Sequence, residues 1–369
     1  MTRSALYQRI PRTIDIENTK DLAHLLQKNP SSIRGWCFQS LDLKNYEKEL
    51  ASKKVRGSLF LGCNTTAEFE KTMSARGALL FPQIKKEPFN QYRADLYSYK
   101  ELYNTFPYEK SYDANVYAWS RTIAKDKNSI DASLATTLHD HAMSDALKKF
   151  TDKTSSKIVG VMGGHDMDRG TEEYTQACEL GKKLTQAGFI VATGGGPGAM
   201  EAANLGALYV NEDLQEPLKQ LATVPNFKEG IDPWARVAYE VAEAAKKPGE
   251  SLGIPTWFYG HEPPNMFATQ IAKYFDNSIR EATLLDDCKA GIIYLQGAAG
   301  TVQEIFQAAC ENYYASGSQV APMILVGKKY WSEQYPAWQL LSALAKGHDM
   351  EEKIALVDSM DEALERIEQ

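Results

Sequence analysis

The sequence predicts an α/β protein whose larger part is a doubly wound parallel sheet, and three observations support this. From Lys157 onward, short apolar runs alternate with amphipathic helical patterns, as in a parallel sheet covered by helices on both faces. Two glycine-rich turns each connect an apolar run to a helical pattern. The length of 369 residues exceeds the usual span of one hydrophobic core, so we expect two domains.

Five apolar runs are the expected strands of this sheet. They cover residues 158–162, 189–193, 291–295, 323–326 and 354–357. Apolar residues at helical spacing lie between the runs, and a last helix is expected over residues 359–369 with Ser359 as its N-cap.

The first half of the chain is less regular. One βαβ-like unit is recognisable, with strands over residues 55–63 and 78–82 and a helix over residues 66–76 that places Phe69 and Met73 on one face. No repeat array or low-complexity tract is evident.

The division into domains follows from the next segment. Residues 131–151 have an imperfect apolar stripe that predicts a helix, and residues 152–156 are expected to be a linker. We therefore expect an N-terminal α/β extension over residues 1–150, which regulates the protein or covers its site, and the sheet domain over residues 151–369.

Composition argues against several classes of partner. The 41 basic and 48 acidic residues give a formal net charge of −7, which provides no basic field to attract nucleic acid or an anionic membrane. The five cysteines are widely spread without metal-ligand spacing, which is typical of reduced thiols in a cytoplasmic protein. No segment has the apolar length of a leader or a membrane span. A small metabolite is the expected ligand.

A metal site is not expected. His139 and His141 flank Asp140, but residues two apart on a helix face in different directions, so a chance cluster is favoured over a ligand set.

The first glycine-rich turn is Thr193-Gly-Gly-Gly-Pro-Gly-Ala-Met-Glu201. Glycines allow a sharp turn and a close approach to a ligand, Pro197 suits the first turn of a helix, and free N–H groups at a helix start favour a phosphate. A purely structural strand-to-helix turn is the alternative.

The second turn is Leu295-Gln-Gly-Ala-Ala-Gly-Thr-Val-Gln-Glu304, which again follows an apolar run and opens a helix. Thr301 could cap the helix and bind a phosphate oxygen, while Glu304 places a carboxylate near the same end of the helix. The alternative for Glu304 is a capping box with Thr301. Both turns follow strands at their carboxyl ends, where ligands of open α/β sheets bind.

A third turn, Gly160-Val-Met-Gly-Gly-His-Asp166, follows the first strand of the sheet. It lacks the G-x-G-x-x-G spacing of a dinucleotide fingerprint, which disfavours a hydride-transfer enzyme.

These motifs together resemble the LOG ("Lonely Guy") family of nucleoside 5′-monophosphate phosphoribohydrolases, long mislabelled as lysine decarboxylases. The resemblance rests on residues 194–202 and on Gly300-Thr-x-x-Glu304, and it spans about residues 157–357. The segment Glu262-Pro-Pro-Asn265 is similar to the nucleotide 5′-monophosphate nucleosidase branch, whose members carry an N-terminal extension. The resemblance implies a Rossmann-like fold and at least a homodimer.

The resemblance also implies site residues. Arg280 and Glu304 match the family's catalytic arginine and glutamate. The expected phosphate- and substrate-binding residues lie in the three glycine-rich turns. They are Gly163, Gly164, Gly194, Gly195, Gly196, Gly198, Met200, Glu201, Gly297, Ala298, Ala299, Gly300 and Thr301. Gln296, Ala298 and Gln303 stand where the family motif has proline, glycine and an acid. Nothing singles out a pyridoxal-phosphate lysine, and no cofactor is expected.

The implied reaction is hydrolysis of the N-glycosidic bond to free base and ribose 5-phosphate. Its oxocarbenium-like transition state suits a carboxylate such as Glu304, with Arg280 gripping the nucleotide. Pairing of Arg280 with Glu281 or Asp276 on a solvated helix is the alternative from local sequence. His165 and Asp166 could contact ribose or base, or cap a loop.

Other interpretations remain open at this stage. A catalytically weak nucleotide-binding sensor is favoured by the altered second turn, and kinship with single-strand DNA-binding proteins is disfavoured by the acidic charge. Asn265 and Met266 are candidates for the base pocket. Trp234 and Tyr239 are expected in the core rather than stacked on a base.

Overall fold

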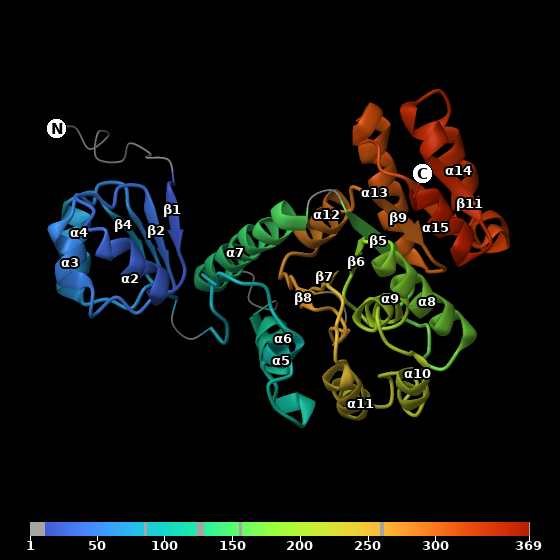
Figure 1. Cartoon of the computed structure of the whole chain (residues 1–369), viewed down its shortest axis with the longest axis horizontal. Helices are drawn as coiled ribbons and strands as arrows, with labels where there is room; N and C mark the ends of the chain where they lie inside the picture. The colour runs from blue at the N-terminus through green and yellow to red at the C-terminus, as the bar shows by residue number, and fades with distance from the viewer. Residues whose placement is uncertain (1–11, 85–86, 124–128, 155–156, 259–261, 369) are drawn as a thin grey trace. The chain divides into compact units, whose positions relative to one another are not determined.

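The computed structural model describes residues 12–84, 87–123, 129–154, 157–258 and 262–368 (Figure 1). The chain forms two compact units. The N-terminal unit comprises Met1–Asp95 and Asp126–Ala146, and the C-terminal unit comprises Leu96–Lys125 and Leu147–Gln369. These bounds differ from the expected division at residue 150, because residues 96–125 group with the C-terminal unit.

Specific contacts explain why residues 96–125 belong to the C-terminal unit. Tyr97 forms an antiparallel bridge with Ile271. The buried Asp113 carboxylate accepts hydrogen bonds from Trp257 Nε1 at 2.9 Å and Lys273 Nζ at 2.6 Å. Burial in this cluster lowers the pKa of Lys273 despite the Asp113 charge.

The N-terminal unit contains a four-stranded parallel sheet in the order β1-β2-β3-β4. Its elements are β1 (Ile14–Ile16), α2 (Thr19–Gln27), β2 (Trp36–Gln39), α3 (Glu47–Ser52), β3 (Leu59–Leu61), α4 (Ala67–Ala75) and β4 (Leu79–Phe81). The βαβ unit expected near residues 55–82 is confirmed as β3-α4-β4. Thr66 caps α4 by accepting from Phe69 N, and Phe69 and Met73 are buried on one face.

This unit is also a short structural repeat, which the sequence analysis did not detect. Ile14 pairs with Trp36, Cys37 with Leu59, and Leu59 with Leu79, so one βα unit follows another at nearly constant spacing. The strands of this repeat are only three or four residues long, which is too short for an apolar pattern to be recognised in the sequence. The stacked aromatic rings of Phe38 and Phe60 pack across adjacent repeats.

The C-terminal unit is an α/β fold with a seven-stranded sheet, and all its strand pairs are parallel. Its strands are β5 (Ile158–Met162), β6 (Ile190–Thr193), β7 (Ser251–Gly253), β8 (Gln270–Ile271), β9 (Gly291–Tyr294), β10 (Met323–Val326) and β11 (Ile354–Val357). The five expected strands are confirmed within a residue. The short strands β7 and β8 were missed because three and two residues carry no periodicity.

The remaining helices lie in the C-terminal unit, except for residues 130–146, which belong to the N-terminal unit. They are α5 (Tyr99–Leu102), α6 (Tyr112–Ile123), α7 (Ile130–Thr154), α8 (Glu172–Gln186), α9 (Ala199–Leu208), α10 (Gln215–Leu221), α11 (Ile231–Ala244), α12 (Asn277–Asp287), α13 (Ala299–Tyr314), α14 (Ala337–Ala345) and α15 (Met360–Glu368), with short turns η1 (Tyr108–Lys110), η2 (Gly317–Gln319), η3 (Tyr330–Gln334) and η4 (Asp349–Lys353). Helix α8 contacts α9 and α15, whereas α13 contacts α12 and α14, as expected for a doubly wound sheet (Figure 1).

Three sequence-based predictions concern the ends of these helices. Helix α7 extends to Thr154, so the linker over residues 152–154 is wrong, and residues 155–156 lie outside the described residues. The Ser359 cap is confirmed, because its hydroxyl accepts from Glu362 N at 3.2 Å. Pro197 precedes α9, whose N-cap is Gly198, and so does not occupy the first helical turn.

The sheet order places the topological switch point between β5 and β9. The strands run β11-β10-β9-β5-β6-β7-β8, so the chain proceeds outward from β5 in one direction and from β9 in the other. In doubly wound sheets the loops on either side of this point diverge and leave a crevice at the carboxyl ends of the strands.

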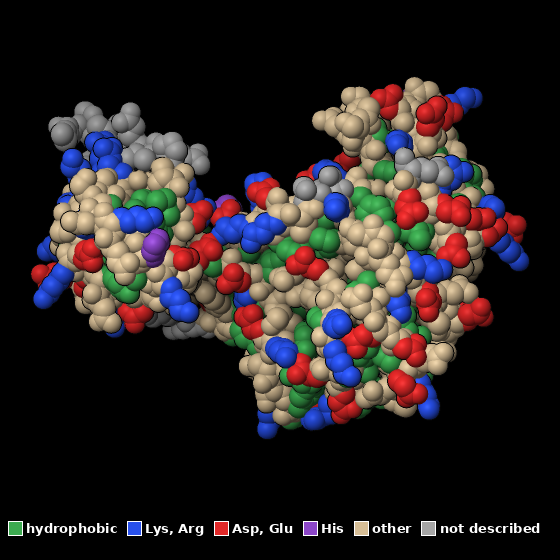
Figure 2. Space-filling view, in the orientation of Figure 1, with side chains coloured by type: hydrophobic (Ala, Val, Ile, Leu, Met, Phe, Trp, Pro, Cys, Tyr) green, Lys and Arg blue, Asp and Glu red, His purple; other side chains and the backbone are tan. Residues whose placement is uncertain are grey.

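The surface carries charge of both signs, interspersed over the visible face (Figure 2). No helix in the described part of the chain is long and apolar enough to cross a membrane. All five cysteines are free thiols, of which Cys37, Cys178 and Cys288 are buried and Cys310 is exposed.

Candidate functional site

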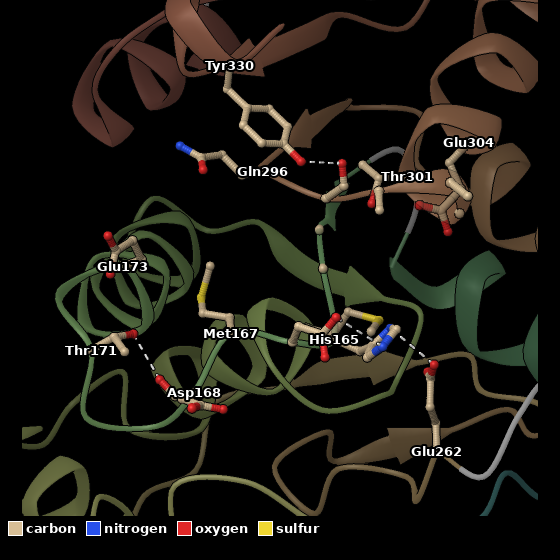
Figure 3. A pocket seen from close by; sticks show the side chains of 18 of the residues that line it. His165, Met167, Asp168, Thr171, Glu173, Glu262, Gln296, Thr301, Glu304 and Tyr330 are labelled. Carbon is tan, nitrogen blue, oxygen red and sulfur yellow. Dashed lines mark hydrogen bonds and ion pairs between the residues drawn. The ribbon is translucent and has the colours of Figure 1, made fainter. Parts of the chain in front are cut away.

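A pocket with a volume of about 600 Å³ lies at the switch point (Figure 3). Its walls come from the segments that follow β5 and β9, together with single side chains from α9, α12, η3 and the loop after β7. The lining residues are Gly163, Gly164, His165, Asp166, Met167, Asp168, Thr171, Glu173, Met200, Glu262, Arg280, Gln296, Gly297, Ala298, Ala299, Gly300, Thr301, Glu304 and Tyr330.

The β9–α13 turn forms one wall of this pocket. Helix α13 begins at Ala299, its N-cap is Ala298, and no described side chain caps it. Ala298, Ala299 and Gly300 are exposed to the pocket. The first N–H groups of this sixteen-residue helix therefore lack a side-chain partner and can bind an anion.

Thr301 does not cap this helix, contrary to expectation. It is buried within the first turn, and its Oγ1 occupies the space where a Cβ on Gly297 would lie, 2.1 Å away. The alternative capping box between Thr301 and Glu304 is also wrong, because Thr301 is already inside the helix. Gly297 is required here by the close approach of Thr301 rather than by a positive φ.

Two contacts hold the turn in place. Tyr330 donates its hydroxyl hydrogen to the Gly297 carbonyl at 2.8 Å, and Gly164 N–H donates to the Gln296 carbonyl at 2.9 Å. The second bond ties the β5 loop to the β9 loop. Ala298 has a negative φ of −98°, so the turn does not use the left-handed backbone that favours glycine at this position.

Arg280 and Glu304 face each other in the pocket. Arg280 extends from α12 and Glu304 from the second turn of α13, with Nη1 and Oε1 3.6 Å apart. The ion pair runs to Glu304 instead of the alternative partners Glu281 and Asp276. Asp276 Oδ1 caps α12 by accepting from Ser278 N at 2.8 Å, and Glu281 accepts from Asn277 Nδ2.

The pair is largely buried yet open to the pocket. The side chains of Arg280 and Glu304 are 11% and 14% exposed. Burial raises the pKa of Glu304 to about 7, although the Arg280 charge opposes the shift. Arg280 Nε is buried without a hydrogen-bond partner among the described residues, so the guanidinium retains donor capacity.

The triple-glycine turn lies beneath the pocket and does not line it. Gly194, Gly195, Gly196 and Gly198 are all buried, and Met200 is the one residue of this segment in the lining. A Cβ on Gly194 would lie 3.5 Å from Arg280 Nη2, and one on Gly196 would lie 3.3 Å from Glu262 Oε2. These glycines therefore make room for side chains that reach the pocket.

Several amides of this turn already have partners within the protein. Gly195 N–H donates to Thr193 Oγ1 at 3.0 Å, and Ala199 N–H donates to the Gly164 carbonyl at 3.1 Å. The Gly198 amide also favours the ionised form of the Glu201 carboxylate, although burial raises the pKa of Glu201. A phosphate at the start of α9 would have to displace these partners.

Glu201 belongs to a sealed ion pair rather than to the pocket. Both it and Arg169 are about 1% exposed in their side chains, and Arg169 Nε donates to Glu201 Oε1 at 2.9 Å. The Arg169 guanidinium also stacks 4.6 Å from the ring of Trp234, which is a core residue as expected. Tyr239 is partly buried against Tyr99 and Phe106.

Asn265 and Met266 do not form a base pocket, contrary to expectation. Both are buried and absent from the lining. Asn265 N–H donates to the Gly195 carbonyl at 2.8 Å, and its Nδ2 donates to the Gly196 carbonyl at 3.1 Å. Asn265 therefore fixes the triple-glycine turn.

His165 and Glu262 form a second polar pair in the pocket. His165 Nδ1 lies 3.2 Å from Glu262 Oε1. Burial raises the pKa of Glu262, whereas a hydrogen bond from Lys228 lowers the pKa of Asp166. Figure 3 draws Tyr330 and Gln296 at the top of the pocket and His165 and Glu262 at the bottom.

Sequence reasoning missed five lining residues. They are Met167, Asp168, Thr171, Glu173 and Tyr330. The first four belong to the loop and helix start that follow β5, a position that could have been inferred from the switch point once the strand order was known. Tyr330 follows β10 and had no signal in the sequence.

A metal centre is not found among the described residues, where no three His, Cys, Asp or Glu side chains are grouped to hold one. His139 is buried, with its Nδ1 3.1 Å from Asp140 Oδ1 and its ring 5.4 Å from that of Phe89.

Comparison with known proteins gives a family match over part of the chain. Residues 156–211 match the model of the SLOG cluster4 family. These residues include β5, α8, β6 and α9, and the match ends before Arg280 and Glu304. No curated protein matches the chain in sequence.

Solved structures show distant similarity. A molybdenum cofactor binding protein from Rippkaea orientalis has 18% identity, with 57% of this chain and 94% of that chain covered and a TM-score of 0.37. The molybdenum cofactor carrier protein from Chlamydomonas reinhardtii has 17% identity, with 57% and 96% covered and a TM-score of 0.35.

Proposed function

We propose that the pocket binds a nucleoside 5′-monophosphate and hydrolyses its N-glycosidic bond, giving free base and ribose 5-phosphate. The observation that carries this proposal is the Arg280–Glu304 pair beside the uncapped start of α13, with the pKa of Glu304 raised to about 7. A carboxyl group that titrates near neutral pH is suited to proton transfer under physiological conditions.

The charge distribution orients the nucleotide. Asp166, Asp168 and Glu173 line the β5 side of the pocket and would repel a phosphate dianion. The exposed amides at the start of α13 attract it. We therefore place the 5′-phosphate at residues 298–301, which explains why a monophosphate should be preferred over the free nucleoside.

This placement brings the ribose to Glu304. In the proposed reaction a water oxygen attacks C1′, the C1′–N bond breaks, and its electron pair leaves with the base. Ionised Glu304 stabilises the positive charge at C1′ and accepts a proton from the water. Arg280, which lines the pocket, binds the nucleotide and holds the Glu304 carboxylate in position.

The base then lies toward His165 and Glu262. The leaving nitrogen needs a proton as the glycosidic bond breaks, and His165 is a histidine of the pocket lining, with Nδ1 3.2 Å from Glu262 Oε1 and Nε2 3.5 Å from Asp166 Oδ2. We assign His165 this role, with Glu262 as its positioning residue.

A binding protein that does not cleave its nucleotide is the competing function. Its main support from the sequence is the altered second turn, and the negative φ of −98° at Ala298 weakens that support because the position does not need a left-handed glycine. The two functions predict the same affinity and differ in turnover, so one experiment separates them.

The test is a panel of purine and pyrimidine nucleoside 5′-monophosphates incubated with the purified chain, with the matching nucleosides as controls. Chromatography detects free base and ribose 5-phosphate. Glu304→Gln and Arg280→Ala are run beside wild type, together with Glu240→Gln and Arg236→Ala, which change the same residue types on the exposed face of α11.

We expect base release from wild type and both α11 variants, and at least a thousandfold loss in Glu304→Gln, about 4 kcal/mol of transition-state stabilisation. Equal release from Glu304→Gln and wild type would refute the role of Glu304. Calorimetric binding without release from any nucleotide would replace the hydrolase by the binding protein.

A further inference from the structure

A second pocket, in the N-terminal unit, is lined almost entirely by cations. It has a volume of about 260 Å³ and is formed by Arg34, Lys54, Val55, Arg56 and Arg76. No acidic residue is among them, and no ion pair joins any of the four basic side chains to a described carboxylate. Such a cluster contrasts with a chain whose formal net charge is −7.

The three arginines occupy equivalent positions in the structural repeat. Each stands directly before a glycine that leads into a strand, in Arg34-Gly35 before β2, Arg56-Gly57 before β3 and Arg76-Gly77 before β4. These glycines have φ values of 77°, 76° and 86°, so the same left-handed turn recurs three times. The repeat therefore builds a column of arginines.

The strand register keeps this column at one edge of the sheet. Ser32 pairs with Lys54 in a parallel bridge, and Gly57 N–H donates to the Gly77 carbonyl at 2.8 Å. Neighbouring strands lie about 4.8 Å apart, so the turns before β2, β3 and β4 span about 10 Å. That span exceeds one phosphate group and suits two or three linked ones.

Like charges gathered in this way repel one another unless an anion compensates them. Arg76 is also a structural residue, because its guanidinium donates to the carbonyls of Ala51 and Lys53 at the end of α3. Neutral carbonyls orient this side chain without cancelling its charge. Arg34 and Lys54 are exposed and remain available to a ligand.

We propose that this pocket, which we name the arginine column (Arg34, Lys54, Arg56 and Arg76), binds a small molecule that carries two or more linked phosphate groups. Arginine forks match phosphate oxygens bidentately, and Lys54 adds a point charge. The volume holds the phosphate chain of such a ligand and leaves any attached group outside. This proposal does not depend on the function of the switch-point pocket.

The test is calorimetric titration of the full chain with pyrophosphate and tripolyphosphate at constant ionic strength, with orthophosphate and sulfate as controls. The key variants are Arg34→Gln, Arg56→Gln and their combination. Lys20→Gln and Lys71→Gln remove exposed charges from α2 and α4 of the same unit and serve as matched controls. Arg280→Ala reports any binding at the switch-point pocket.

We expect tripolyphosphate to bind more tightly than orthophosphate, each single variant to weaken binding at least tenfold, and the combined variant to abolish it. Binding should persist in Arg280→Ala and in both lysine variants. Circular dichroism and the unfolding midpoint verify that the arginine variants are folded.

Three outcomes would overturn the proposal. They are no binding to folded wild type, an equal loss in the lysine controls, and tighter binding of a single-stranded oligonucleotide than of tripolyphosphate, which would indicate a nucleic-acid surface instead.

Discussion

The two glycine-rich turns of the C-terminal unit look alike in sequence and differ in structure. Each joins a parallel strand to a helix, and each helix carries a glutamate that faces an arginine. At the first turn the Glu201–Arg169 pair is sealed, with both side chains about 1% exposed. At the second, the Glu304–Arg280 pair is 14% and 11% exposed and faces a pocket of about 600 Å³.

The position of each glutamate along its helix explains the difference. Glu201 stands three residues after the N-cap Gly198, where its carboxylate can accept from the N-cap amide, as in a capping box. Glu304 stands six residues after the N-cap Ala298 and instead faces α12. One carboxylate satisfies its own helix start, and the other leaves its helix start open to a ligand. The first turn is buried against other parts of the protein, and the second opens on the pocket.

The largest expected contrast is in stability, between the two arginines. Arg169→Met should lower the free energy of unfolding by about 3–5 kcal/mol, because Glu201 is left buried without its partner. Arg280→Met should change it by about 1 kcal/mol or less, because Glu304, with a pKa already near 7, can take up a proton.

Denaturant unfolding of both variants measures this contrast, and base release should disappear in Arg280→Met. A similar loss of stability in the two variants would show that both pairs are structural.

Replacing a glycine by alanine should lower the stability of the protein at the first turn and not at the second. Gly198 has a φ of 71°, and a Cβ there would lie 2.5 Å from the Gly164 carbonyl oxygen, so Gly198→Ala should cost about 3 kcal/mol. Nothing lies within 4 Å of a Cβ on Gly300, and Gly300→Ala should be neutral or slightly stabilising, by about 0.5 kcal/mol.

Thermal unfolding of these two alanine variants is the measurement. A destabilised Gly300→Ala would contradict the open geometry of the second turn.

Much of the C-terminal unit could be predicted from its sequence, because its longer strands are buried apolar runs with helical patterns between them. All four residues of β10 are buried, for example, and its bounds were predicted without error. The N-terminal repeat could not be predicted, since its strands are short and its turns share only an Arg-Gly pair. Residues 96–125 group with the C-terminal unit through long-range contacts such as Asp113–Lys273, which have no local signature in the sequence.

The site was partly predictable for a related reason. The second turn, Arg280 and Glu304 were named as candidates because a motif and a family resemblance pointed to them. His165 was left with two interpretations, since its partner Glu262 is nearly a hundred residues away and pairs with it only in the fold. Glu201 was assigned to the phosphate site through the family resemblance, and its ion pair with Arg169 has no signal in the local sequence.

The pH dependence of turnover should distinguish the two glutamates. Ionised Glu304 is the form that acts in the proposed reaction, and its pKa is raised to about 7, so about one tenth is ionised at pH 6 and most is ionised at pH 8. The value of kcat/KM should therefore rise with pH through about 7 and fall about tenfold per unit below it.

Glu304→Gln should remove this limb of the profile, and Glu201 should contribute no limb because it does not reach the pocket. A profile that keeps the same limb in Glu304→Gln would assign the titration to another group.

The smallest expected effect concerns the N-terminus of α13, where no side chain caps the helix. Ala298→Asp places a carboxylate at the N-cap, where it can accept from the N–H of Gly300 or Thr301, and should stabilise the fold by about 0.5–1 kcal/mol. The same carboxylate would occupy the amides proposed to bind phosphate and would repel the dianion, so the Kd for a nucleoside monophosphate should rise at least tenfold. Ala298→Asn is the matched control, because it caps the helix without charge and should weaken binding less. A more stable Ala298→Asp variant with unchanged affinity would place the phosphate elsewhere and leave the second turn, like the first, with a structural role.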